Sequence, residues 1–253
     1  MVIGVDIGNT TIEIGFIKNI NDIVSYKLAT DLKKTSDDWL LTFRNLFMME
    51  NIYYDDVKLI LISSVVPHIE DKIATVLGNI FKLKPLFINK DVKVPIKINY
   101  KNPEEVGSDR LLNAFSASKK IKPPLVVVDL GTAITFDVVN SKGEYEGGLI
   151  FPGIESSLEC LFSKAAKLPK VHLVQMGSVV GKTTQDSINA GIFWGYVSLI
   201  DGVIDKVESE YKEPFKVIIT GGGADIISKG LREGYILNRK LIMEGFYYLS
   251  KEL

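Results

Sequence analysis

The chain has 253 residues, 46% of them hydrophobic, which is enough for one large hydrophobic core or two smaller ones. Thirty basic and 31 acidic side chains give a net charge of −1, so no chain-wide attraction to nucleic acid or to an anionic membrane is expected. The single cysteine, Cys160, cannot form an internal disulfide, which fits a reducing cytoplasm. The first residues do not resemble a signal peptide and the apolar runs are short, so we expect neither export nor a membrane span.

The chain opens with two short β-branched runs that predict strands, Val2–Val5 and Ile12–Ile17. Between them, Asp6–Thr11 is rich in turn-forming residues, so the opening unit is a strand, a loop and a strand. Apolar spacing then predicts a helix capped by Ser36 or Asp37. The predicted elements of this stretch are a helix, a strand, a helix and a strand at residues 37–50, 59–62, 68–81 and 86–88.

A change of composition divides the chain near its middle. Pro95–Pro103 predicts irregular chain and Asp109–Lys120 predicts a helix. The charged, proline-containing stretch Lys119–Pro124 then interrupts the pattern. We therefore predict an N-terminal domain at residues 1–118 and a C-terminal domain at residues 119–253, both of the α/β class.

The opening pattern recurs directly after that interruption. The apolar strand Leu125–Val128 runs into Asp129-Leu130-Gly131-Thr132-Ala133, which matches Asp6-Ile7-Gly8-Asn9-Thr10. Because each match begins one half of the chain, the repeat indicates a duplicated α/β domain. The second half continues with predicted helices at residues 154–161 and 187–210 and a predicted strand at residues 215–219.

The two Asp-x-Gly loops have a chemistry that suits a polyphosphate. A glycine two residues after a strand-end aspartate lets backbone amides approach phosphate oxygens without a side-chain collision. Asp6 and Asp129 would repel phosphate, so we interpret both as holders of a cation, directly or through water. A plain hairpin turn is the alternative for either loop taken singly, and the duplication weakens it.

A third candidate site lies at the start of the Asp109–Lys120 helix. Asp109 could accept the proton of a hydroxyl substrate during phosphoryl transfer, since a loose transition state needs little deprotonation before attack. Arg110 could pair with a substrate carboxylate or with phosphate. The alternative is that Ser108 or Asp109 only caps the helix.

Two glycine-rich segments and the histidines carry weaker signals. Thr220–Asp225 follows a predicted strand and could pass close to a ligand, or it could simply connect a strand to a helix. Gly177–Thr183 is one residue too short between its glycines for a Walker A loop and lacks a preceding strand, so we exclude that function and expect Lys182 to be solvated. His68 and His172 receive no role.

Several short segments together resemble the type III pantothenate kinase family, a branch of the acetate and sugar kinase/Hsp70/actin superfamily. The resemblance covers nearly the whole chain and keeps the family order. It rests on the two Asp-x-Gly loops and on further segments listed here: Tyr100, Pro103, Gly107 and Asp109-Arg110 with Asn113-Ala114; Gly147-Gly148 with Ile150 and Pro152-Gly153; Lys167-Leu168-Pro169; and Thr184, Ser187-Ile188 and Gly191.

The resemblance implies two similar actin-like ATPase (ribonuclease H-like) domains, each with a mixed sheet flanked by helices. It implies transfer of the γ-phosphoryl group of ATP to pantothenate, the first step of coenzyme A biosynthesis. Mg²⁺ and a monovalent cation, K⁺ or NH₄⁺, are implied as cofactors. A cytoplasmic homodimer is implied as well, with the substrate site near the subunit interface.

The resemblance also assigns roles residue by residue. Asp109 is the implied proton acceptor, and Asp129 is the implied ligand of the monovalent cation, while Asp6 would hold Mg²⁺ through water. The implied ATP contacts are Asp6, Ile7, Gly8, Asn9, Thr10, Thr11, Ile12, Glu13 and Thr132. The implied pantothenate contacts are Tyr100, Gly107, Ser108, Asp109, Arg110 and Thr184.

Two other functions stay open from the sequence alone. One is a phosphotransferase or phosphatase of the same superfamily acting on another metabolite. The other is a non-catalytic nucleotide-binding paralogue that regulates a partner. The presence of Asp6, Asp109 and Asp129 argues against a decayed enzyme.

Overall fold

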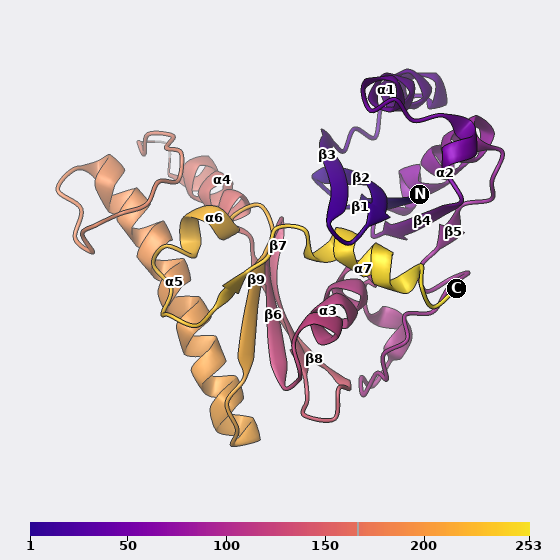
Figure 1. The fold of residues 1–253 in the computed structure, drawn as a ribbon. Helices are drawn as coiled ribbons and strands as arrows, with labels where there is room; N and C mark the ends of the chain where they lie inside the picture. The colour runs from indigo at the N-terminus through magenta and orange to yellow at the C-terminus, as the bar shows by residue number, and fades with distance from the viewer. Residues whose placement is uncertain (166) are drawn as a thin grey trace. The chain divides into compact units, whose positions relative to one another are not determined.

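The computed structural model describes residues 1–165 and 167–253 and divides into two compact units, whose elements are labelled in Figure 1. The first unit comprises Met1–Ile96, Lys101–Ser116 and Leu241–Leu253, and the second comprises Lys97–Tyr100 and Ala117–Lys240. The main division falls between Ser116 and Ala117 of helix α3 (Ser108–Lys120), two residues before the position that the sequence analysis predicted, after residue 118. Leu241–Leu253 belongs to the first unit although it ends the chain, and Lys97–Tyr100 belongs to the second unit although first-unit residues precede and follow it.

The first unit contains a five-stranded mixed sheet in the order β3-β2-β1-β4-β5. The central strand β1 (Val2–Ile7) is antiparallel to β2 (Thr11–Asn19) and parallel to β4 (Leu59–Ser64). The sheet is completed by β3 (Asp22–Ala29), antiparallel to β2, and by β5 (Leu86–Phe87), parallel to β4.

The second unit repeats this arrangement, in the order β8-β7-β6-β9-β10. Its strands are β6 (Leu125–Leu130), β7 (Ala133–Val139), β8 (Tyr145–Pro152), β9 (Lys216–Thr220) and β10 (Ile236–Leu237). Strand directions also match, since β6 is antiparallel to β7 and parallel to β9. The predicted fold class is confirmed, and β6 is the counterpart of β1, as the repeated Asp-x-Gly pattern indicated.

Helix α1 (Ser36–Met49) begins one residue earlier than predicted, and its cap is a residue the sequence analysis did not choose. The Thr35 hydroxyl accepts a hydrogen bond from the Asp38 amide (3.2 Å), and the Asp38 carboxylate accepts one from the Thr35 amide (2.9 Å). The predicted caps, Ser36 and Asp37, are wrong because this reciprocal capping box occupies residues 35 and 38.

Three helices surround the first sheet. Helices α1 and α2 (Pro67–Phe81) contact one another and supply aromatic and aliphatic side chains to the first hydrophobic core, among them Trp39 and Phe43. The C-terminal helix α7 (Leu241–Leu249), yellow in Figure 1, contacts β1 and β2. It fits because the cross-strand pair Gly4 and Gly15 has no side chains: a Cβ at Gly4 would lie 2.6 Å from the Phe246 ring.

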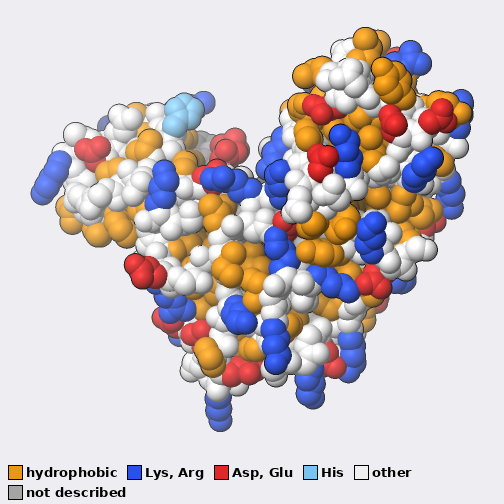
Figure 2. All heavy atoms as spheres, in the orientation of Figure 1, with side chains coloured by type: hydrophobic (Ala, Val, Ile, Leu, Met, Phe, Trp, Pro, Cys, Tyr) orange, Lys and Arg blue, Asp and Glu red, His pale blue; other side chains and the backbone are white. Residues whose placement is uncertain are grey.

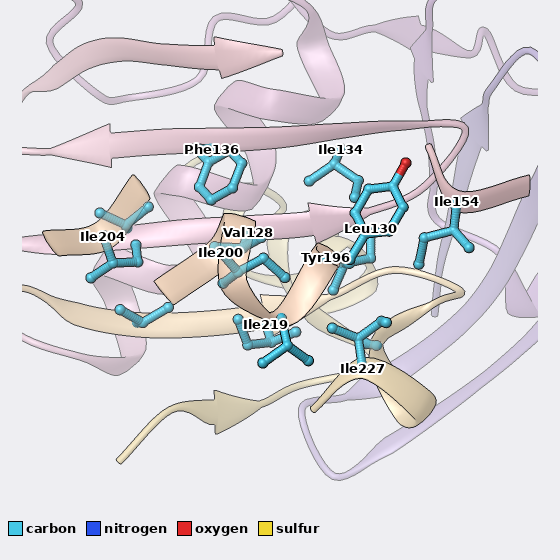
Figure 3. Close-up of a cluster of buried hydrophobic side chains, with 14 of the residues drawn as sticks. Val128, Leu130, Ile134, Phe136, Ile154, Tyr196, Ile200, Ile204, Ile219 and Ile227 are labelled. Atoms are coloured by element: carbon cyan, nitrogen blue, oxygen red, sulfur yellow. The ribbon is translucent and has the colours of Figure 1, made fainter. Parts of the chain in front are cut away.

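The second core lies between β6, β7 and β9 of the sheet and the long helix α5 (Thr184–Tyr211), with α4 (Ile154–Lys164) and α6 (Ala224–Ile227) beside it. Figure 3 shows Val128 and Phe136 from the sheet facing Ile200 and Ile204 from α5. Among the described helices, α5 alone is long and apolar enough to cross a membrane. Because Ile200 and Ile204 are fully buried against the sheet, α5 is a core helix.

The surface charge is mixed. On the face shown in Figure 2, lysine and arginine side chains are interspersed with aspartate and glutamate. This distribution agrees with the nearly neutral net charge of the chain.

Candidate active site

The first Asp-x-Gly loop is a closed turn with exposed polar residues. The Gly8 amide donates to the Thr11 carbonyl (3.0 Å), which closes the turn. Thr30, the residue after β3, stabilises the turn, because its hydroxyl donates to the Gly8 carbonyl (2.7 Å) and its amide to the Thr10 carbonyl (2.9 Å). Asn9, Thr10 and Thr11 are exposed, so the turn presents polar residues at the surface.

The residues that flank this turn divide by strand face. Asp6 lies directly opposite Glu13 in the β1–β2 ladder, so both carboxylates are on one face of the sheet. Glu13 accepts a hydrogen bond from Ser25 (2.7 Å) and pairs with Lys27 (3.5 Å). Ile7 and Ile12 point to the other face and are fully buried, so of the predicted ATP-binding residues these two can offer a ligand only backbone groups.

The second loop is held by a glycine on a neighbouring element. The Gly153 amide donates to the Thr132 carbonyl (3.1 Å), and Ser156 donates to the same carbonyl (3.2 Å). A Cβ at Gly153 would lie 2.1 Å from that oxygen, so only glycine permits this approach. Thr132 itself is exposed at the tip of the loop.

Asp129 lies among glycines. A Cβ on Gly221 would be 2.4 Å from the Asp129 Oδ1 atom, and Gly221 has a φ of +90°, which glycine adopts most readily. The Gly223 amide donates to the Leu130 carbonyl (3.0 Å), which fixes the glycine-rich Thr220–Asp225 segment against the Asp129 loop. A carboxylate oxygen is a suitable ligand for a hard cation.

Asp6 has a different partner, which the sequence analysis did not identify. Ser63 on β4 pairs with Asp6 across the parallel β1–β4 ladder and is fully buried. Its hydroxyl donates to the Asp6 carboxylate (2.8 Å) and lies 3.0 Å from the Ser108 hydroxyl. Since the single Ser63 proton goes to Asp6, Ser108 must donate to Ser63, and Ser108 in turn accepts from the Ser64 amide (3.2 Å). Ser63 thus connects Asp6 to the start of α3.

Asp109 lies one residue further along α3. Its Oδ1 atom accepts a hydrogen bond from the Arg110 amide (2.8 Å), and a Cβ on Gly107 would lie 2.4 Å from that atom. Burial raises the pKa of the Asp109 carboxyl above its ordinary 3.8, although the hydrogen bond and charge of Arg110 oppose the rise. The Ser108 hydroxyl bonds to Ser63 and Ser64 of β4 instead of capping α3. Helix capping therefore does not explain the presence of both Ser108 and Asp109.

The remaining predicted substrate contacts belong to the second unit. Tyr100 is 37% exposed, and its ring lies over Gly147, where a Cβ would be 2.9 Å from two ring carbons. Thr184 is exposed at the first turn of α5, after the Thr183 cap, in a groove of about 320 Å³. That groove is lined by Leu161, Leu168, Thr184, Ser187, Ile188, Gly191 and Ile192.

The structure therefore groups the predicted residues into two sets. Asp6, the Gly8–Thr11 turn and Gly107–Arg110 lie in the first unit, where Ser63 links the aspartate to α3. Asp129, Thr132, Tyr100 and Thr184 lie in the second unit. Within the described residues no three His, Cys, Asp or Glu side chains gather as a metal cluster.

The glycine-containing Gly177–Thr183 segment is not a phosphate loop of the Walker type. The described residues from 167 to 183 form no strand, and Lys182 is exposed, as predicted. His68, His172 and Cys160 take part in none of the contacts above.

The sequence of the chain matches a known protein family. The model of type III pantothenate kinases matches residues 2–206. The chain belongs to the type III pantothenate kinase family. A type III pantothenate kinase of Persephonella marina is 56% identical over 247 residues, covering 98% of this chain and 97% of that protein. One from Sulfurihydrogenibium sp. is 51% identical and covers 99% of this chain and the whole of that protein.

Solved structures agree with the fold at low sequence identity. A Campylobacter jejuni structure described as a candidate Baf family transcriptional activator aligns with a TM-score of 0.62 and 21% identity, over 99% of this chain and 98% of its own. The ethanolamine utilization protein EutJ of Carboxydothermus hydrogenoformans aligns with a TM-score of 0.57 and 14% identity, over 98% and 89% of the two chains. At these identities the alignments establish a shared fold and nothing about activity.

The Ser63 bridge yields a test within the first unit. Replacing Ser63 with alanine leaves Ser108 and Asp6 without their shared buried partner, so we expect the free energy of unfolding to fall by about 1–3 kcal/mol. Catalytic turnover should fall as well, because the variant frees the start of α3, which carries Asp109. Urea denaturation and steady-state turnover measure the two effects.

Ser64→Ala is the matched control for Ser63→Ala. It removes a neighbouring hydroxyl that accepts from the Val66 amide (3.1 Å) but keeps the amide that donates to Ser108. Equal stability and turnover in the two variants would contradict the bridging role of Ser63.

Proposed function

We propose that this chain transfers the γ-phosphoryl group of ATP to the primary hydroxyl of pantothenate, the first step of coenzyme A biosynthesis. Membership of the type III pantothenate kinase family, with relatives matched over nearly their full length, supports this reaction. The structural observation that carries it is Asp109, a partly buried carboxylate with a raised pKa in the same unit as the first Asp-x-Gly turn.

Asp109 is the proposed proton acceptor. In a loose phosphoryl-transfer transition state the substrate hydroxyl loses its proton late, so the carboxylate mainly orients the hydroxyl and receives the proton as the new phosphate ester bond forms. Its close packing against Gly107 and its hydrogen bond from the Arg110 amide limit its rotation. The Arg110 guanidinium can pair with the pantothenate carboxylate or with a phosphate oxygen.

ATP is proposed to bind through the turn residues Gly8 to Thr11 and through Thr132. Mg²⁺, when bound, would neutralise the charge of the phosphate oxygens. Asp6 would hold the hydrated Mg²⁺ through water, and the hydrogen bond from Ser63 keeps this carboxylate in one orientation. Ile7 and Ile12 contribute by shaping the turn from the core.

A monovalent cation, K⁺ or NH₄⁺, is proposed to bind at Asp129. The carboxylate lies close to the backbone of Gly131 and Gly221, where a Cβ would be 3.6 Å and 2.4 Å from its Oδ1 atom. Tyr100, Gly107–Arg110 and Thr184 are the proposed pantothenate contacts. Thr184 belongs to the groove described above, where aliphatic side chains accompany its hydroxyl.

Asp109→Asn separates catalysis from structure. Because folding raises the pKa of this carboxyl, the folded state binds its proton more tightly, and the ionised form costs stability at any pH above the folded pKa. At pH 7 we expect the free energy of unfolding of the variant to be at least that of the parent. Any gain in stability should disappear below pH 3.8, the ordinary pKa of the carboxyl, because the parent carboxyl is then protonated in both the folded and the unfolded state. Turnover should fall by about 10²-fold or more, with ATP binding retained.

Asp38→Asn is the control of opposite sign. Hydrogen bonds from Thr35 lower the pKa of Asp38, so its ionised form stabilises the fold above pH 3.8 and the substitution should destabilise the protein at pH 7 without impairing catalysis. Near-normal turnover of Asp109→Asn would contradict the role of Asp109 as proton acceptor and would leave it a structural role only.

A substrate panel tests the reaction itself. ATP consumption should be observed with pantothenate and should rise when K⁺ or NH₄⁺ replaces Na⁺, whereas common sugars should give no turnover. Asp129→Asn should weaken this activation because it removes the anionic cation ligand. Turnover only with a sugar would overturn the proposal, and absence of any turnover would favour a regulatory paralogue.

We further propose a homodimer formed through the second unit. At the end of β8, Ile150 is 64% exposed and Phe151 is 43% exposed. Phe151 and α5 line a second groove, of about 260 Å³, which shares Gly191 and Ile192 with the groove of Thr184. Within the described chain a Cβ at Gly191 or Gly195 would meet no atom within 4 Å, so a second copy of α5 can approach closely here.

Ile150→Glu should convert the dimer to a monomer, because it places a charge in the proposed apolar interface. Sedimentation equilibrium measures the mass. Val179→Glu is the control, since Val179 is 68% exposed and lies outside both grooves. A parent protein that sediments as a monomer would contradict the dimer.

The proposed location is the cytoplasm, where ATP and a reducing environment suit a chain with one cysteine. We propose ATP, pantothenate and a second copy of the chain as the partners. We expect the protein to bind neither nucleic acid nor a membrane. Recovery of the protein with membranes after cell fractionation would contradict this location.

A further inference from the structure

The Lys97–Tyr100 segment is attached to the edge strand β8 of the second sheet through an isolated parallel β-bridge. The Tyr145 amide donates to the Lys97 carbonyl (2.8 Å), and the Asn99 amide donates to the Tyr145 carbonyl (2.8 Å). Ile98 and Tyr145 form the corresponding parallel bridge. The chain on either side, Met1–Ile96 and Lys101–Ser116, belongs to the first unit. These few residues therefore depend on β8 for their position.

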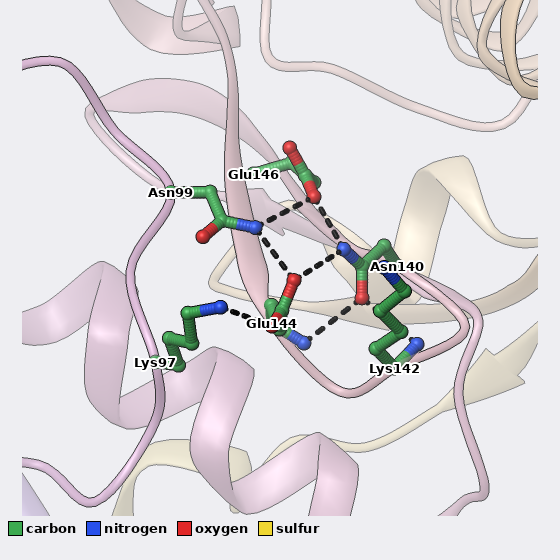
Figure 4. Close-up of polar contacts among 6 residues, drawn as sticks. All are labelled: Lys97, Asn99, Asn140, Lys142, Glu144 and Glu146. Carbon is green, nitrogen blue, oxygen red and sulfur yellow. Dashed lines mark hydrogen bonds and ion pairs between the residues drawn. The ribbon is translucent and has the colours of Figure 1, made fainter.

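Side chains reinforce the backbone pairing at the β7–β8 hairpin (Figure 4). Glu144 receives the Lys97 ammonium on Oε1 (2.6 Å) and the Asn99 amide group on Oε2 (2.7 Å). Asn99 also donates to Glu146 (3.1 Å). Asn140 donates to Glu144 (3.2 Å) and to Glu146, so both carboxylates are tied to the hairpin as well as to the added segment.

Glu144 is the centre of this cluster. Hydrogen bonds from Lys97, Asn99 and Asn140 lower the pKa of its carboxyl to about 2, so it stays ionised throughout the physiological range. Its side chain is 16% exposed, although that of Lys97 is 70% exposed. An isolated exposed ion pair would contribute little, but a network of several charge-assisted hydrogen bonds from two segments restricts both of them.

The aromatic ring of Tyr100 is fixed at the other end of the segment. It rests on Gly147, whose φ of +113° lies in the region that glycine favours. A side chain at position 147 would collide with the ring, since a Cβ would lie 2.9 Å from Cδ2 and Cε2. Glu144 and Glu146 therefore hold the backbone before Tyr100, and Gly147 provides the surface on which the ring lies.

The hairpin of the first unit shows that this arrangement is not a general property of the duplicated fold. There Asn19 accepts from the Asn21 amide (2.9 Å), just as Asn140 accepts from the Lys142 amide (2.9 Å). Its acidic residue, Asp22, pairs at 3.7 Å with Lys18 of the same hairpin. The printed side-chain contacts of the turn residues Asn19 and Asp22 stay within their own hairpin, whereas Glu144 of the second hairpin reaches Lys97 and Asn99.

We propose that Glu144, supported by Asn140, is a positioning residue that holds Tyr100 in the orientation needed to contact pantothenate. The proposal rests on the proposed function, in which Tyr100 contacts that substrate. Glu144 itself touches neither substrate. It determines where the Lys97–Tyr100 segment lies, and so affects capture of pantothenate more than the transfer step.

Steady-state kinetics of the full chain test the proposal. Glu144→Ala should raise the KM for pantothenate about tenfold, the effect of losing one or two net hydrogen bonds, with kcat and the KM for ATP changed less than about twofold. Glu144→Gln keeps an acceptor for Asn99 but loses the ion pair, so its KM should be intermediate. Asp22→Ala, at the matching hairpin, should leave all three constants unchanged.

A double-mutant cycle with Tyr100→Ala shows whether Glu144 acts through Tyr100. If it does, Glu144→Ala has no further effect on the KM for pantothenate in the Tyr100→Ala background. An equal increase in both backgrounds, no increase in either, or a fall in kcat without a change of KM would overturn the proposal.

Amide hydrogen exchange examines the attachment without any substrate. The Asn99 and Tyr145 amides should exchange faster in Glu144→Ala than in the parent or in Asp22→Ala. Unchanged exchange would overturn the positioning role even if the chain phosphorylates pantothenate. Faster exchange in a protein that does not use pantothenate would instead mean that the proposed function has failed, and the role of Glu144 in that reaction with it.

Discussion

The hydrogen-bonded chain from Ser108 through Ser63 to Asp6 is the interaction on which the first unit's functional residues depend. It exists because β1 and β4 run parallel and place Asp6 beside Ser63. The fully buried Ser63 hydroxyl then has two partners, one at the end of a strand and one at the start of α3. Asp6, proposed to hold hydrated Mg²⁺, and the segment that carries the proposed base, Asp109, are consequently linked by one buried side chain.

In the second unit, a glycine instead of a serine lies beside the corresponding aspartate, Asp129. Thr220 on β9 occupies the place opposite Asp129 that Ser63 occupies opposite Asp6. The next residue, Gly221, brings backbone close to the Asp129 carboxylate, where any Cβ would collide. A duplicated frame thus carries two different surroundings for its aspartates, a hydroxyl in one and bare backbone in the other. The proposal of different cations at the two positions rests on this difference.

Two short exchanges of chain join the duplicated units. Helix α7 packs on the first sheet because Gly4 and Gly15 leave space for Phe246 and Met243. In the other direction, Lys97–Tyr100 pairs with β8 of the second sheet. The proposed pantothenate contacts Tyr100 and Asp109, only nine positions apart in sequence, therefore belong to different units. Each is positioned by the sheet on which its own segment packs.

The sequence by itself determined the features that short stretches encode. The strand before each aspartate, the glycine two residues later and the helix beginning near Asp109 were all predicted from local patterns, and several such segments in order identified the family correctly. The predicted cap of α1 was wrong because Ser36, Asp37 and Thr35 are all plausible caps, and only the reciprocal bond with Asp38 selects Thr35.

Only the tertiary structure decided which distant residues support that site. Ser63 and Asp6 are 57 positions apart, and Glu144 and Asn99 are 45 apart, so neither contact leaves a periodic pattern in the chain. The place of α7 likewise depends on glycines near the opposite terminus. Strand pairing and side-chain packing bring these residues together, and local propensity contains no information about such partners because they lie far apart in the chain.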